Sequence, residues 1–104
     1  MKLDLKFQLT NLDGSSTVGL NAGQFLADRL SLKTKHFSAG KACILAYSMY
    51  KDGIIEIDAE DLKLLEQEVS ERDSPVYQNL SNLFANQILK AIEKSREESK
   101  KKVN

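Results

Sequence analysis

The stretch that decides the fold reads SAGKACILAYSMYKDGIIEIDAEDLKLLEQEV and covers residues 38–69. It holds two amphipathic segments on either side of the short β-branched run 54–57. Ser38 is a typical N-cap for a helix over about 39–51, and Gly53 stands where a left-handed C-cap residue is expected. We therefore predict a helix, a short strand and a second helix.

Apolar residues recur at helical spacing in both segments, which predicts one buried face on each helix. The face of the first helix consists of Ala42, Leu45, Ala46, Met49 and Tyr50. The second helix, over about 59–71, has Asp58 as its predicted N-cap. Its buried face consists of Leu62, Leu65 and Val69, and Leu64 widens it.

The N-terminal residues alternate between apolar and polar, which is typical of a strand with one buried face. The apolar set is Leu3, Leu5, Phe7 and Leu9. Asp13 and Gly14 then form a dipeptide that favours tight turns. We expect residues 17–20 to return as a short second strand, and residues 54–57 to join this hairpin as a third.

Two further helices follow from capping signals. Asn21 and Gln24 have the spacing of a capping box, which predicts a short helix ending near Ser31. Ser74 and Pro75 mark the start of the longest helix. Its apolar stripe consists of Val76, Leu80, Leu83, Phe84, Ile88, Ala91 and Ile92.

The predicted fold is a single α+β domain over residues 1–94, with a charged C-terminal extension over residues 95–104. A small N-terminal antiparallel hairpin or three-stranded sheet is covered by about four helices, of which the C-terminal one is longest. A chain of 104 residues matches the length of one domain. The extension has no apolar stripe, so we expect it to be solvated and to fray.

The charge balance and the cysteine content limit the classes of function that fit this sequence. Fifteen basic and fifteen acidic residues cancel, so the net charge gives no general attraction to nucleic acid or to anionic membranes. Cys43 is the only cysteine in the sequence, which fits a reducing compartment. Charges at every second position of the N-terminal segment exclude a signal-peptide apolar region. We predict a soluble cytoplasmic protein.

Few residues have the chemistry of a catalytic or metal site. His36 is the only histidine, and a pair with Cys43 is the one nucleophile arrangement available. We interpret Cys43 as a packing residue and His36 as a loop residue next to a helix N-terminus. The acidic residues 58–68 are interpreted as a capped, solvated helix face. We predict no enzyme activity, no cofactor and no metal site.

A calcium site is an alternative for the run Asp52–Glu56, which resembles the second half of an EF-hand loop. With Gly53 at the loop's glycine position, Tyr50 falls on a ligand position and Ala59 falls where the bidentate glutamate belongs. Neither side chain supplies the carboxylate that calcium needs. The sequence of this run is explained equally by the end of a helix followed by a strand.

The run 46–65 resembles small proteins encoded by tailed phages and prophages. The turn at 12–14 and the short Leu-Ala-x-x-Leu helix at 26–30 match the same pattern, and the likeness covers most of residues 3–92. The loop 32–37 and the charged tail have no counterpart. The resemblance implies a phage-associated protein, in the host cytoplasm or the virion, and assigns no functional residue.

We therefore expect a non-enzymatic protein-binding module. It would be an assembly or virion component that works as an oligomer, or a small inhibitor or adaptor of a host protein. The residue types enriched in interface hot spots, together with the terminal apolar stripe, give the predicted contact residues. These are Tyr47, Tyr50, Tyr77, Phe84, Ile88 and Ile92. The alternative is a nucleic-acid-binding regulator. Only the lysine run 100–102 favours it, and this run is flanked by acidic residues.

Overall fold

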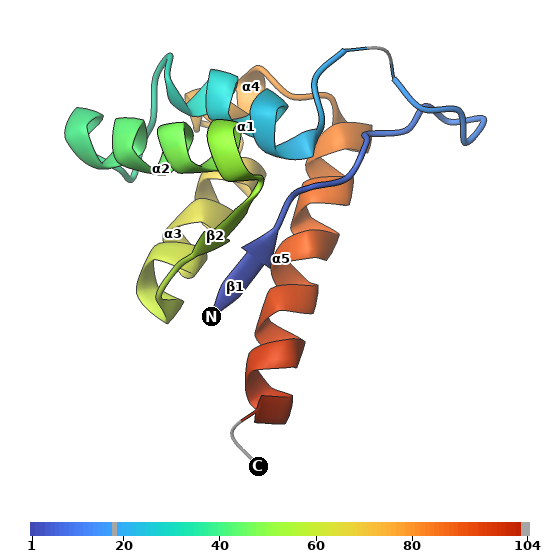
Figure 1. Ribbon diagram of the computed structural model, residues 1–104. Coiled ribbons are helices and arrows are strands. Elements are labelled where there is room, and N and C mark those ends of the chain that lie inside the picture. Colours follow the sequence, from blue (N-terminus) through green and yellow to red (C-terminus); the bar gives the residue numbers. More distant parts are fainter. Residues whose placement is uncertain (18, 103–104) are drawn as a thin grey trace.

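The computed structural model describes residues 1–17 and 19–102, with side chains up to Lys100. Helices α1 and α2 lie side by side across one end of two short strands, while α5 runs along β1 and contacts α3 (Figure 1). The expected α+β class is confirmed, with a small antiparallel sheet and the longest helix last. The elements are β1 (Lys2–Asp4), α1 (Ala22–Leu30), α2 (Ala39–Asp52), β2 (Ile54–Glu56), α3 (Ala59–Ser70), α4 (Pro75–Gln78) and α5 (Asn82–Lys102).

The sheet joins two segments that are far apart in the sequence. β1 pairs antiparallel with β2, and Leu3 lies opposite Ile55. Both side chains are buried while their neighbours along each strand are exposed. The strand expected over 54–57 is therefore present as the direct partner of β1.

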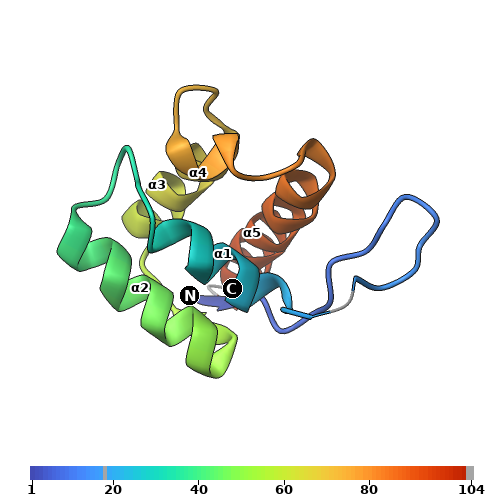
Figure 2. The same ribbon diagram turned by 90° about the horizontal axis from the view of Figure 1, so that it is seen from above.

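The expected hairpin is much smaller than the Asp-Gly turn indicated. Among the described residues it is reduced to one antiparallel bridge between Thr10 and Ser16. The return strand expected over 17–20 includes Val18, which lies outside the described residues. Residues 10–17 belong to a loop that projects away from the body of the molecule on the side opposite α2 (Figures 1 and 2).

The alternating N-terminal segment stops being a strand after β1 because its backbone turns to α1. The amide of Ala22 donates to the carbonyl of Phe7 over 2.8 Å, and the amide of Gly23 donates to that of Leu5 over 3.0 Å. These carbonyls satisfy two of the N–H groups that the start of a helix leaves without partners. The predicted burial holds for Leu3, Leu5 and Leu9, which are in the core, whereas Phe7 is only partly buried.

The local signals for helix ends are confirmed. Asn21 and Gln24 form a complete capping box at the start of α1. Ser38 and Asp58 accept backbone hydrogen bonds at the starts of α2 and α3. Gly53 ends α2 with φ of 74°, a left-handed conformation that favours glycine.

The helix predicted to start at Pro75 is interrupted after one turn. α4 ends at Gln78, and Asn79 leaves the helical region with φ of −101° and ψ of 12°. The hydroxyl of Ser81 then accepts from the amide of Phe84 over 3.1 Å, which caps a new helix. The apolar stripe continues through the break, so periodicity gives no sign of it.

α5 keeps contact with the domain beyond the point where solvation was expected. Ser95 is only 3% exposed, and its hydroxyl donates to the carbonyl of Lys2 over 2.5 Å. The guanidinium of Arg96 contacts the Glu66 carboxylate over 2.6 Å. The first turn of the predicted extension therefore packs on the domain.

Close packing of α1 against α2 depends on Gly23. A methyl group at this position would lie 2.9 Å from the carbonyl oxygen of Met49 and 3.4 Å from the Cα atom of Gly53. Backbone atoms cannot move aside as a flexible side chain can. The absence of a side chain at Gly23 thus lets the start of α1 approach the end of α2.

We expect Gly23→Ala to destabilise the protein by about 1–3 kcal/mol, because the clash outweighs the gain in helix propensity. Gly40→Ala is the matched control: Gly40 is exposed in α2 with open space around it. That change is expected to be neutral or to stabilise by about 0.4–1 kcal/mol. Urea unfolding of both variants measures the difference, and equal midpoints would contradict this account of the helix contact.

Candidate functional site

The most exposed apolar surface on the helices lies on the outer side of α2. Tyr47 is 76% exposed, Ile44 64% and Tyr50 52%. We call these three residues the α2 surface. Large apolar and tyrosine side chains gathered on one exposed helix face are typical of protein interfaces.

The helical period explains how this surface arises. Ala42, Leu45, Ala46 and Met49 are buried and fix one side of α2 against the core. Residues at positions between these four point to solvent, as Ile44 and Tyr47 do. Tyr50 was expected on the buried face, and the structure corrects this. A single α2 helix thus carries two apolar faces, of which only one is covered.

A groove of about 390 Å³ runs beside the α2 surface, between α1 and α2. Its lining is mainly apolar, and Ala27 and Ala46 contribute small side chains to it from the two helices. The complete lining is Ala27, Asp28, Ser31, Ala46, Tyr47, Tyr50 and Lys51. Both tyrosines that were predicted as contact residues on α2 line this groove.

A second hollow of about 240 Å³ lies at the other end of the same helix pair. Leu32, 57% exposed, and Cys43 are among its lining residues. Cys43 was interpreted as a packing residue, but its side chain is exposed. It lies beside Ile44 on α2, outside the core-facing set.

The other predicted contact residues are not part of this surface. Ile88 and Ile92 are fully buried, because the α5 stripe packs against α3 and β1 of its own chain. Assigning them to a binding surface therefore has to be corrected. Phe84 is half-buried and packs edge-on against Phe25, with ring centroids 5.4 Å apart. Tyr77 is also half-buried, and its hydroxyl donates to Asn82.

A buried carboxylate, which sequence reasoning missed, fixes the loop that leads into α2. Glu68 is fully buried, although it was expected on a solvated face. Its carboxylate accepts from the backbone amides of Lys35, His36 and Phe37 at 2.9–3.2 Å. The hydroxyl of Ser74 donates to it over 2.9 Å. Four donors surround the charge, so its burial is compensated.

Outside this buried carboxylate, an ion-pair cluster joins the same loop to the end of α3. The Lys35 ammonium lies 2.8 Å from both the Glu71 and the Asp73 carboxylates. The Nε2 atom of His36 also lies 2.8 Å from Glu71. His36 is thus a loop residue next to the start of α2, as expected, and it helps to hold α2 in place.

This cluster predicts acid sensitivity. Hydrogen bonds from Lys35 and His36 lower the pKa of Glu71 below its usual 4.5, and a hydrogen bond from Lys35 lowers the pKa of Asp73 below 3.8. A lowered folded-state pKa stabilises the fold above the unfolded-state value, and this stability is lost as pH falls through the folded-state pKa.

We expect the stability of the protein to fall as pH is lowered from about 5 to about 2.5. Glu71→Gln should make this dependence less steep. Thermal melting across this range is the measurement, with the exposed Glu97→Gln as control. Identical pH profiles for the protein and the Glu71→Gln variant would contradict the assignment.

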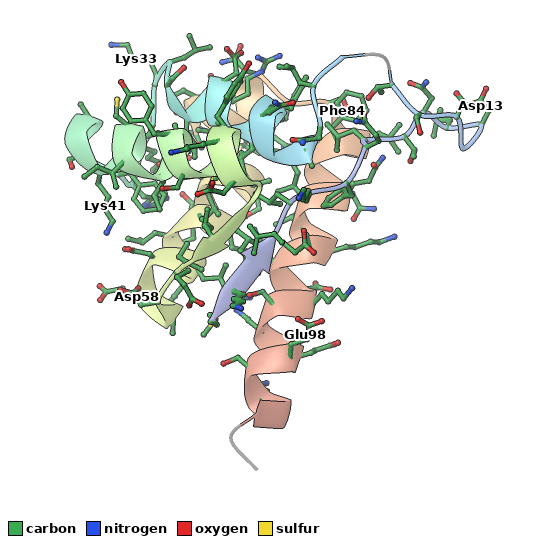
Figure 3. The ribbon with its side chains drawn as sticks, in the orientation of Figure 1. Asp13, Lys33, Lys41, Asp58, Phe84 and Glu98 are labelled. Atoms are coloured by element: carbon green, nitrogen blue, oxygen red, sulfur yellow. The ribbon has the colours of Figure 1, made fainter. Side chains whose placement is uncertain are left out.

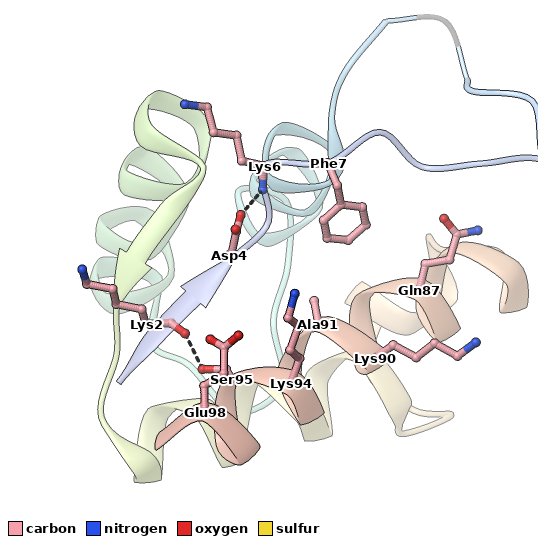
Figure 4. Close-up of a pocket in the computed structure, with 10 residues that line it drawn as sticks. All are labelled: Lys2, Asp4, Lys6, Phe7, Gln87, Lys90, Ala91, Lys94, Ser95 and Glu98. Atoms are coloured by element: carbon pink, nitrogen blue, oxygen red, sulfur yellow. Dashed lines mark hydrogen bonds between the residues drawn. The ribbon is translucent and has the colours of Figure 1, made fainter. Parts of the chain in front are cut away.

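A different hollow, of about 360 Å³, lies between β1 and α5 (Figure 4). Four lysines and two acidic residues line it, along with Phe7 and Gln87. The ammonium of Lys94 is directed into the hollow, whereas those of Lys2, Lys6 and Lys90 point away from it. The charged lining residues are Lys2, Asp4, Lys6, Lys90, Lys94 and Glu98.

Comparisons with protein-family models, with curated proteins and with solved structures found no match for this chain. Within the described residues, no three histidine, cysteine or acidic side chains are grouped closely enough to hold a metal ion. None of the helices over that part of the chain has both the length and the apolar character of a membrane span.

Proposed function

We propose that the protein is a non-enzymatic protein-binding module that uses the α2 surface and the adjoining groove between α1 and α2. The observation that carries this proposal is the exposure of Ile44, Tyr47 and Tyr50 on one side of a single helix. Apolar surface left in water forgoes roughly 25 cal/mol for each square ångström that a partner could bury. A partner that covers these side chains recovers this free energy.

The surroundings of the α2 surface support the proposal. The carboxylate of Glu68 and the ion pairs of Lys35 hold the loop before α2, so the helix is presented in one orientation. A preorganised surface binds with a smaller loss of conformational entropy. The groove adds a concave region next to the protruding tyrosines, and a partner side chain can enter it.

The phage association and the cytoplasmic location that the sequence predicts stay predictions. Two roles remain within the proposal: an assembly component and an inhibitor or adaptor of a host protein. They differ in whether the partner is another copy of this chain.

A nucleic-acid-binding regulator is the second candidate, and the hollow between β1 and α5 favours it. Four lysines against Asp4 and Glu98 give its lining an excess of positive charge. Phosphate contacts of this kind are sequence-independent and weaken steeply with salt. Three of the four ammonium groups point away from the hollow, so they do not converge on one phosphate there, and the α2 surface is the stronger candidate.

The proposal is tested by retention of proteins from a lysate on the tagged full chain. We expect a stoichiometric protein partner that survives nuclease treatment, is lost with Tyr47→Asp and is kept with the control Glu97→Ala. Both positions are exposed, so both variants should fold. Partner binding that Tyr47→Asp leaves unchanged would contradict the assignment to the α2 surface. Recovery of nucleic acid that is abolished by nuclease and by salt would favour the regulator instead.

A further inference from the structure

The projecting loop carries a large apolar side chain at its tip. Leu12 is 92% exposed, more than any residue of the α2 surface. Its neighbour Asp13 marks the tip in Figure 3, well away from the rest of the molecule. A single exposed leucine needs no explanation by itself. Leu12 differs from such a residue because the loop that carries it is ordered and anchored by hydrogen bonds.

Hydrogen bonds hold the tip in one shape. The amide of Asn11 donates to the carbonyl of Ser15 over 2.8 Å, and the amide of Gly14 donates back to the carbonyl of Asn11 over 3.0 Å. The Asp13 carboxylate accepts from the Ser15 amide over 3.0 Å and from its hydroxyl over 2.6 Å. Leu12 is therefore presented on an ordered turn.

The base of the loop is fixed to α5. The side-chain amide of Gln87 accepts from the Thr10 amide and donates to the Thr10 carbonyl, both over 2.9 Å. This pair of bonds replaces the β-ladder partner that a longer hairpin would have supplied. Across the loop base, the amide of Thr17 donates to the carbonyl of Leu9 over 2.9 Å. The loop thus extends from the domain as an anchored projection.

The same chain carries a groove that suits this tip. The groove between α1 and α2 is mainly apolar and, at about 390 Å³, has room for a leucine side chain. Lys51 is one of the residues that line the groove, so its positive charge can attract the Asp13 carboxylate beside Leu12. Asp28, the acidic residue of the lining, is already paired with Arg29. The size and apolar character of the groove therefore suit a leucine side chain, and Lys51 suits the carboxylate next to that leucine.

Within one molecule the two features cannot meet. The loop projects on the side of α5, and α2 lies on the opposite side of α1 (Figures 1 and 2). A contact between different surfaces of two identical chains is heterologous, so each new copy still offers a free tip and a free groove. Such contacts build rings or open chains.

We infer that the Leu12 loop tip of one copy binds in the groove between α1 and α2 of a second copy, so that the chains associate head to tail. The inference rests on the proposed function, because it names the partner of that same groove. A contact centred on one side chain is small, so association is expected only at a concentration on the order of 0.1–1 mM.

Sedimentation equilibrium of the full chain and of two variants tests this. Leu12→Asp removes the tip and leaves the groove, whereas Tyr47→Asp alters the groove and leaves the tip. We expect the average mass of the unaltered chain to rise with concentration, and each variant alone to stay monomeric. A mixture of the two should form one-to-one dimers and nothing larger, because one intact tip and one intact groove remain.

Several outcomes would overturn the inference. A chain that stays monomeric at about 1 mM has no such contact. Association that survives Leu12→Asp but not Tyr47→Asp would mean that two α2 surfaces pair with each other. A mixture that remains monomeric would exclude the tip-to-groove pairing. The proposed function fails separately, when Tyr47→Asp leaves capture of a different protein unchanged.

Discussion

Glu68→Ala is expected to lower the free energy of unfolding by roughly 3 kcal/mol or more. The substitution removes the acceptor of three backbone amides and of the Ser74 hydroxyl, and the Phe37 amide and this hydroxyl are buried. An unsatisfied buried donor costs about 1–3 kcal/mol, and total stability is about 5–15 kcal/mol for a domain. Urea unfolding followed by circular dichroism measures the loss.

Two further variants make the Glu68 prediction specific. Glu68→Gln keeps the size of the side chain but directs an NH2 group at N–H donors, so it should also destabilise. Glu97→Ala, at an exposed position of α5, should change stability by no more than about 0.5 kcal/mol. A Glu68→Gln variant as stable as the unaltered protein would mean that the negative charge is not needed.

Ile88→Ala is expected to cost about 2–5 kcal/mol of stability, because it opens a cavity under α5 where the side chain is fully buried. Tyr47→Ala is the matched comparison: its side chain is mostly exposed, so stability should change by no more than about 0.5 kcal/mol. Calorimetric or urea unfolding separates the two.

The Ile88 prediction also tests how the predicted contact residues divide between core and surface. Ile88 should affect folding alone, and Tyr47 should affect binding alone. If Ile88→Ala left stability unchanged while weakening partner binding, the packing of α5 on α3 and β1 would be contradicted. Equal stability losses at both positions would mean that Tyr47 is packed rather than exposed.

Helix ends were predictable because their signals are local. Asn21 with Gln24, and Gly53 after α2, act within four residues of the backbone groups they satisfy. The break before α5 was not predictable, since the cap at Ser81 lies inside a continuous apolar stripe. Pairing of β1 with β2 has no local signal either, whereas Asp13 and Gly14 suggested a nearby partner.

The site was predictable only in part, for a related reason. Residue type alone pointed to Tyr47 and Tyr50 as contact residues, and the structure leaves both exposed beside a groove. Type could not separate them from Ile88, because burial depends on which helix face meets the core. Glu68 was missed because glutamate is almost never fully buried, and its donors come from a loop distant in sequence.

The short sheet has a consequence for the order in which the molecule can assemble. β1 needs residues 54–56 as its partner, and the carbonyl of Lys2 also accepts from Ser95. Contacts over such separations form slowly, since the intervening chain must first close into a loop. During synthesis the leucines of the first nine residues are made well before β2 and α5, so β1 lacks its strand partner and its helix cover until those segments follow. A nascent chain arrested before residue 95 should therefore expose Leu3, Leu5 and Leu9 to chaperones.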